Sequence, residues 1–112
     1  MKNFLFLLFI CFTSQTSSVK VLEKENFQVL MEQESQVIDV RTPEEYALGY
    51  IKGAILIDYK ASDFQATISA LNRNVTYLIY CRSGNRSDKA SKIMDSLGFK
   101  KIYDLKGGYM NW

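Results

Sequence analysis

Histidine is absent from this chain of 112 residues. Its absence excludes Ser-His-Asp and Cys-His nucleophile pairs and every metal site built on imidazole. Cysteine is scarce as well: Cys11 and Cys81 are the two copies, too few for a cysteine-rich zinc site. We therefore expect no metal and no other cofactor. A reactive cysteine in this chain must be activated by backbone dipoles and arginines.

A strong excess of one charge is also lacking. The 14 Lys and Arg residues against 12 Asp and Glu residues give a net charge of +2, with no basic run and no internal repeat. This balance does not favour a nucleic-acid partner. The length allows one domain, and the 47% of apolar residues is ordinary for a globular protein.

The N-terminal residues follow the three-part pattern of a secretory signal. A short basic start precedes an unbroken apolar run over residues 4–12, and residues 13–18 are small and polar. As a helix the run rises about 14 Å, well short of the ~20 residues that span a membrane. A first core strand or helix is the alternative interpretation.

We expect residues 1–18 to be a signal peptide that is cleaved and residues 19–112 to form the domain. The protein would then be exported, for instance to the periplasm, with no membrane attachment after cleavage. Cys81 would be the one cysteine left, so the mature fold would hold no internal disulfide.

Strand and helix patterns alternate after residue 18. Apolar runs predict five strands, at Val19–Leu22, Gln36–Val40, Ala54–Ile57, Val75–Tyr80 and Lys101–Leu105. Helical spacing of apolar residues predicts helices within residues 23–34, 42–49, 62–71 and 87–97. Continuous apolar strands separated by helices indicate an α/β fold with a mainly parallel sheet and helices on both faces. Sites in such sheets lie outside the carboxyl ends of the strands.

Two capping boxes are predicted at helix starts. Thr42 precedes Pro43 and is followed three residues later by Glu45, a strong start signal. Ser62 with Gln65 suggests a second box of the same kind.

The segment from Cys81 to Ser87 follows the fourth predicted strand and leads into the last helix. A cysteine there lies beneath backbone N–H groups and the positive end of a helix, a place that favours a thiolate and binds anions. Gly84 supplies freedom in φ for the curled loop, and Arg82 and Arg86 add positive charge. The alternative interpretation is that Cys81 is a small buried hydrophobe at a strand end, and inert.

Four segments resemble motifs of the single-domain rhodaneses, a family of sulfurtransferases. They are residues 38–46, 49–54, 81–87 and 105–112, and the similarity runs from about Val21 to Trp112. In the second motif the family usually has a histidine and a proline where this chain has Tyr50 and Lys52. We expect this departure to alter local packing rather than chemistry.

The resemblance implies a five-stranded rhodanese-like fold and a ping-pong reaction without a cofactor. Cys81 would take sulfur from an anionic donor such as thiosulfate, become a persulfide, and pass the sulfur to cyanide or a thiol. The substrate cradle implied by the resemblance comprises Arg82, Ser83, Gly84, Asn85, Arg86 and Ser87. Asp39 and Arg41 would be supporting residues that brace this loop. Alternatively, Arg41 only pairs with Glu45 or Asp39 on the surface.

Three competing functions remain open at this stage. Phosphatases and arsenate reductases of the same architecture use a Cys-x5-Arg loop, whereas Arg86 is five positions after Cys81, which makes a smaller ring. A non-catalytic binding module is the second alternative, although such modules usually lack the cysteine. A redox role is the third, and it would need a second thiol from a partner protein. In an oxidising compartment Cys81 would also need a reducing thiol protein, or would rest as a persulfide.

Overall fold

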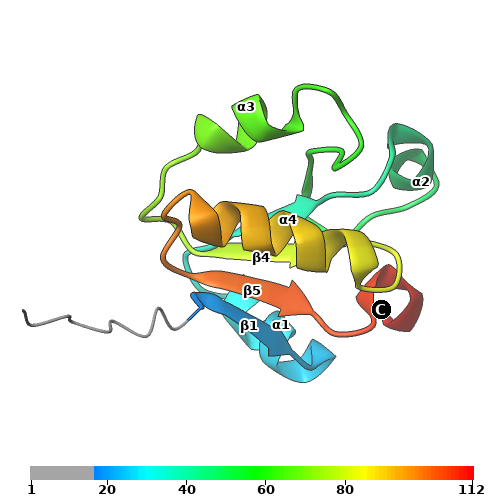
Figure 1. The fold of residues 1–112 in the computed structure, drawn as a ribbon. Helices are drawn as coiled ribbons and strands as arrows, with labels where there is room; N and C mark the ends of the chain where they lie inside the picture. The colour runs from blue at the N-terminus through cyan, green and yellow to red at the C-terminus, as the bar shows by residue number, and fades with distance from the viewer. Residues whose placement is uncertain (1–16) are drawn as a thin grey trace, which may run out of the picture.

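The computed structural model describes residues 17–112 (Figure 1). Most of the predicted signal peptide, including Cys11, lies outside the described residues. In the described part no helix is long and apolar enough to cross a bilayer.

Five strands and four α-helices alternate along the chain. The strands are β1 (Val19–Leu22), β2 (Gln36–Asp39), β3 (Ile55–Leu56), β4 (Tyr77–Tyr80) and β5 (Ile102–Leu105). The helices are α1 (Lys24–Met31), α2 (Pro43–Ala47), α3 (Phe64–Ser69), α4 (Asn85–Ser96) and the 3-10 helix η1 (Gly108–Asn111). Strands β2 to β5 are each shorter than the apolar runs that predicted them. Next to β2 and β3 the residues left outside the strands, Val40, Ala54 and Ile57, are still buried.

The strands form one sheet in the order β1-β5-β4-β2-β3, and every pair in it is parallel. The predicted α/β fold is confirmed, and the sheet is parallel throughout rather than mainly so. All five strands therefore end at one edge of the sheet, where the loops that follow β2 and β4 meet.

Helices cover both faces of the sheet, as the continuous apolar strands predict (Figure 1). On one face α3 and α4 contribute Phe64, Ile68, Ala90 and Met94 to a core that also holds Ile79 of β4. On the other face α1 contributes Phe27, which packs with Val37, Leu78 and Leu105. The strands are buried on both sides, which is the reason for their unbroken hydrophobicity.

Of the two predicted capping boxes, the one at Thr42 is confirmed and the one at Ser62 is wrong. The Thr42 side chain accepts from the backbone N–H of Glu45, and the Glu45 carboxylate accepts from the backbone N–H of Thr42. The box predicted at Ser62 is absent from this region: α3 has Asp63 at its N-cap without a side-chain hydrogen bond. A preceding turn, in which Phe64 N–H donates to Ala61 O, delays the helix past Ser62.

Candidate active site

Strand register brings two predicted site segments together. In the β2–β4 pair, Asp39 lies beside Tyr80. Cys81 directly follows Tyr80, and Arg41 follows Asp39 by two residues. Both therefore emerge at the carboxyl edge of the sheet, as parallel strands require.

The Cys81 thiol lies at the floor of the loop that follows β4. The residue is 1% exposed, and its Sγ accepts a hydrogen bond from the Gly84 N–H at 3.0 Å. Sγ also lies 3.3 Å from Oγ of the fully buried Ser87. Gly84 is the N-cap of α4, with φ of +112°, a backbone conformation that glycine adopts freely. Helix α4 thus begins two residues before its predicted start at Ser87, and its first turn forms the far side of the loop.

Backbone hydrogen bonds from η1 fix the near side of the loop. Tyr109 N–H donates to Cys81 O at 2.8 Å, and Met110 N–H donates to Arg82 O at 3.0 Å. In a trans peptide the C=O and N–H groups point in opposite directions. The amides that follow these two carbonyls, those of Arg82 and Ser83, therefore point away from η1.

Close approach of η1 to the loop depends on Gly108. A Cβ added there would meet the carbonyl oxygens of Cys81 and Arg82 at 2.6 Å, and φ is +62°. Both the space and the backbone conformation therefore require glycine.

Arg86 is bound to a carboxylate rather than free for a ligand. Its Nη1 and Nη2 donate to Oε1 and Oε2 of Glu45 at 2.6 and 2.9 Å. These bonds lower the pKa of Glu45 to about 2, and they raise the pKa of Arg86. Arg86 therefore stands beside the cradle as one half of an ion pair with Glu45 of α2, and the charge of Cys81 is a further cause of its raised pKa.

Asp39 and Arg41 form a buried ion pair. Arg41 Nη2 donates to Asp39 Oδ2 at 2.7 Å and to Gly49 O at 2.7 Å, and the side chains are 4% and 0% exposed. Tyr80 OH donates to the same Asp39 oxygen at 2.6 Å. The alternative of a surface pair for Arg41 is thus wrong. The pair joins β2, β4 and the loop at Gly49.

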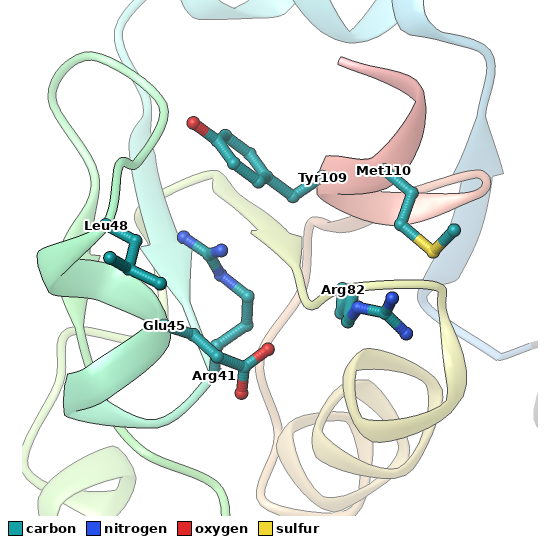
Figure 2. Close-up of a pocket in the computed structure, with 6 residues that line it drawn as sticks. All are labelled: Arg41, Glu45, Leu48, Arg82, Tyr109 and Met110. Atoms are coloured by element: carbon teal, nitrogen blue, oxygen red, sulfur yellow. The ribbon is translucent and has the colours of Figure 1, made fainter.

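A pocket of about 260 Å³ opens beside the loop (Figure 2). It is lined by Arg41, Glu45, Leu48, Arg82, Tyr109 and Met110. Figure 2 shows Leu48 on one side, Met110 and Arg82 on the other, and the Arg41 guanidinium with the Tyr109 ring between them. The guanidinium carbon of Arg41 lies 4.3 Å from the centroid of that ring.

The other predicted cradle residues differ in exposure. Arg82, Ser83 and Asn85 are exposed, so their side chains are available to solvent or a ligand. Ser87 instead faces the interior, close to the carboxyl group of Asp104 on β5. Burial raises the pKa of Asp104 to about 6, although the Ser87 hydroxyl favours the ionised form.

Sequence reasoning missed several residues of this site. Glu45 is interpreted from the sequence as a helix cap and as a possible surface partner of Arg41, whereas in the structure its carboxylate binds Arg86. Tyr109 and Met110 contact the loop only through tertiary packing. The one local feature of the sequence that could have indicated a close approach of this segment is the glycine pair 107–108. Within residues 17–112 no cluster of acidic, cysteine or histidine side chains is placed to hold a metal ion.

Residues 23–112 match the family described as the Rhodanese-like domain. The chain belongs to the rhodanese-like family. The resemblance drawn from its motifs is thereby confirmed.

Rhodanese relatives match the chain over most of its length. Thiosulfate sulfurtransferase GlpE of Pseudomonas fluorescens strain Pf-5 is 36% identical over 97 residues, which are 86% of each chain. A rhodanese-related protein from Thermoplasma volcanium superposes with a TM-score of 0.74 at 29% identity, covering 83% of this chain and 89% of its own. The human single-domain sulfurtransferase TSTD1 gives a TM-score of 0.68 at 26% identity and covers 82% and 93%. These similarities support sulfurtransferase activity for this rhodanese-like chain.

Proposed function

We propose that this protein is a sulfurtransferase that carries sulfane sulfur on Cys81. The Cys81 thiolate attacks the outer sulfur of an anionic donor such as thiosulfate, the S–S bond of the donor breaks, and sulfite leaves with its electron pair. A thiol or cyanide then takes the outer sulfur from the Cys81 persulfide and restores the thiolate. No cofactor takes part in either step.

The single observation that carries this proposal is the hydrogen bond from Gly84 N–H to Cys81 Sγ, 3.0 Å long, at the N-terminus of α4. A sulfur that accepts a backbone N–H at a helix N-terminus is stabilised as the thiolate, the nucleophilic form. The same environment favours the negatively charged persulfide. The Arg82 and Ser83 amides, which point away from η1, are further donors for a bound oxyanion.

Intact mass measurement after thiosulfate treatment tests the proposal. Wild type should gain one sulfur atom that cyanide removes, and Cys81→Ser should gain none. Cys11→Ser is the matched control in the full chain and should gain the sulfur as wild type does. Equal sulfur uptake by wild type and Cys81→Ser would contradict the proposal.

Absence of any uptake would instead favour a binding module or a redox protein. A Cys-x5-Arg phosphatase is disfavoured because Ser87, not arginine, stands six positions after Cys81. Hydrolysis of an aryl phosphate without sulfur transfer would reverse this choice.

We also propose that the protein is exported and that residues 1–18 are removed. The support is the charge and hydropathy pattern of the N-terminal sequence. N-terminal sequencing of protein from a periplasmic fraction should start near residue 19. Recovery of the full chain from the cytoplasm alone would contradict export.

In an oxidising compartment we expect a reducing thiol protein as partner, or a persulfide that protects Cys81. Mass spectrometry of protein purified from that compartment should show a thiol or a persulfide at Cys81. Recovery with Cys81 irreversibly oxidised would contradict both forms of protection.

A further inference from the structure

Asp104 is a buried titratable group that the proposed sulfur transfer leaves unused. It lies on β5, it is 4% exposed, and its Oδ1 has no hydrogen-bond partner among the described residues. In the β4–β5 pair it lies beside Ile79, which precedes Cys81 by two residues. Residues two apart on a strand share a face, and both Ile79 and Cys81 belong to the core that α3 and α4 cover. The carboxyl group of Asp104 therefore lies on the same face of the sheet as the Cys81 sulfur.

The hydroxyl of Ser87 connects these two groups. Ser87 is fully buried in the first turn of α4, and its Oγ lies 3.3 Å from Cys81 Sγ and 3.3 Å from Gly84 O. The same hydroxyl acts on the Asp104 carboxyl group and favours its ionised form. A hydroxyl carries one hydrogen, so it cannot donate to the sulfur and to the carboxylate at the same time. Cys81 and Asp104 therefore compete for the hydrogen of Ser87.

The surroundings of Asp104 leave its charge uncompensated. In residues 17–112 it takes part in none of the ion pairs. Its register partners, Val21 on β1 and Ile79 on β4, are apolar. On α4 the buried Ser91 leaves its own Oγ without a partner among the described residues, and Asp88 adds repulsion. Burial raises the pKa of Asp104 to about 6, so most molecules carry the carboxylate at pH 7.

We propose that Asp104 is a positioning residue of the sulfur site. It acts on Cys81 through Ser87, because its carboxylate draws the hydroxyl hydrogen away from Sγ and disfavours negative charge on the sulfur. This inference rests on the proposed sulfur transfer at Cys81 and adds no covalent step to it.

Two opposite effects on the reaction follow. With Asp104 ionised, a smaller fraction of Cys81 is thiolate at a given pH. The thiolate that does form is more basic and therefore a stronger nucleophile, and its attack moves the charge to the outer sulfur of the persulfide. Arg86, the cation that acts on Cys81 from α4, stays charged throughout, because its hydrogen bonds to Glu45 raise its pKa. Asp104 is therefore the neighbour whose ionisation changes the sulfur near neutral pH.

Thiolate absorbance and the rate of sulfur uptake test the inference in the Cys11→Ser chain, where Cys81 is the one cysteine. Ultraviolet absorbance, after subtraction of the signal without Cys81, gives the pH at which half of the thiolate has formed. Asp104→Asn should lower this midpoint by about 1 pH unit. Well above the midpoint it should slow sulfur uptake from thiosulfate about threefold, and well below the midpoint it should speed uptake by a similar factor. The two rate profiles should therefore cross, which a merely structural role of Asp104 would not produce.

Two further variants identify the path from Asp104 to the sulfur. In a Ser87→Ala background, Asp104→Asn should move the midpoint much less, because the hydroxyl that couples the two groups is gone. Asp88→Asn is the matched control, since it removes a carboxylate from the same turn of α4. The Asp88 side chain is 50% exposed and pairs with Lys92, so its removal should leave the midpoint and the rate profile close to those of wild type.

The outcomes separate the inference from the proposed function. If wild type takes up no sulfur, the proposed function fails, and the absorbance midpoints still decide whether Asp104 acts on Cys81. An unchanged midpoint in Asp104→Asn, or uptake that is slower at every pH, overturns the inference while the function stands. An equal shift with and without the Ser87 hydroxyl would overturn the path through Ser87. Asparagine has the shape of aspartate, so Asp104→Asn should fold as wild type does.

Discussion

Asp104 is the residue whose surroundings conflict most with its charge. It lies in β5 beneath α4, it is 4% exposed, and its Oδ1 has no hydrogen-bond partner among the described residues. Burial raises its pKa from 3.8 to about 6, and Asp88 on α4 adds repulsion. The folded protein therefore binds a proton at Asp104 more tightly than the unfolded chain does, and ionisation opposes folding.

Asp104→Asn should raise the free energy of unfolding at pH 8 and have little effect at pH 3.5. In wild type, the protonated Asp104 contributes fully to the free energy of unfolding below pH 3.8. This contribution is lost as the pH rises through about 6, because folding raises the pKa of Asp104. The gain at pH 8 should be about 3 kcal/mol at most, at 1.36 kcal/mol per pKa unit. Urea unfolding at both pH values measures it.

Asp63→Asn is the control for this substitution. Asp63 is exposed and its side chain caps no N–H of α3, so stability should change little at either pH. An equal gain at both pH values in Asp104→Asn would contradict the assignment of a raised pKa.

At the scale of elements, η1 acts as a support for the loop at Cys81. Its amides bind the carbonyls of Cys81 and Arg82, and Gly108 allows its backbone to come close enough. These hydrogen bonds join backbone groups only. They therefore depend on the conformation of η1 more than on the side chains of its residues. The loop keeps its curl because β4, α4 and η1 each hold part of it.

Gly108→Ala should destabilise the protein and slow persulfide formation. Strain at positive φ costs about 1–3 kcal/mol, and the clash with two carbonyl oxygens adds a further ~1–3 kcal/mol. Gly53→Ala is the matched control: φ is +84°, yet a Cβ there meets nothing within 4 Å. Gly53→Ala should lower the free energy of unfolding by the backbone strain alone, and the rate of sulfur uptake should stay unchanged. Urea midpoints and the rate of the mass increase distinguish the two variants, and equal losses in both would contradict a supporting role for η1.

At the scale of the whole molecule, the Glu45–Arg86 pair connects segments 41 residues apart in sequence. It joins α2, which follows β2, to α4, which follows β4, across the mouth of the site. The pKa of Glu45 is lowered from 4.5 to about 2, so the ionised form favours folding. This contribution is present above pH 4.5 and is lost as the pH falls toward 2.

Glu45→Gln should therefore destabilise the protein at pH 6 and much less at pH 3. The side chain is partly exposed, so we expect a loss of about 1–2 kcal/mol at pH 6 rather than the full value of the pKa shift. Comparing variant with wild type at each pH by urea unfolding separates this effect from that of Asp104, which has the opposite sign. Glu44→Gln, at an exposed position in the same helix turn, should show no such dependence on pH. A loss that is equal at pH 3 and pH 6 would contradict the pairing.

The order of elements, the parallel sheet and the place of Cys81 all follow from local patterns along the chain. Apolar runs such as the one that ends at Tyr80 are buried on both faces, and only a parallel sheet covered by helices buries them so. The cap at Thr42 was equally readable, since its partners lie three residues apart. The Ser62 box failed because a competing turn of the same length decided where α3 begins.

Which charges are paired and which are free is a property of the folded molecule and cannot be read from local sequence. Arg86 follows Cys81 closely in sequence, yet its partner is Glu45, which the β2–β4 register brings to it. Arg41 is buried because Asp39 and Gly49 surround it, and η1 reaches the loop from the end of the chain. Periodicity and local spacing report burial and hydrogen bonds within a few residues. Pairing between side chains far apart in sequence depends on register and packing, which the three-dimensional fold alone specifies.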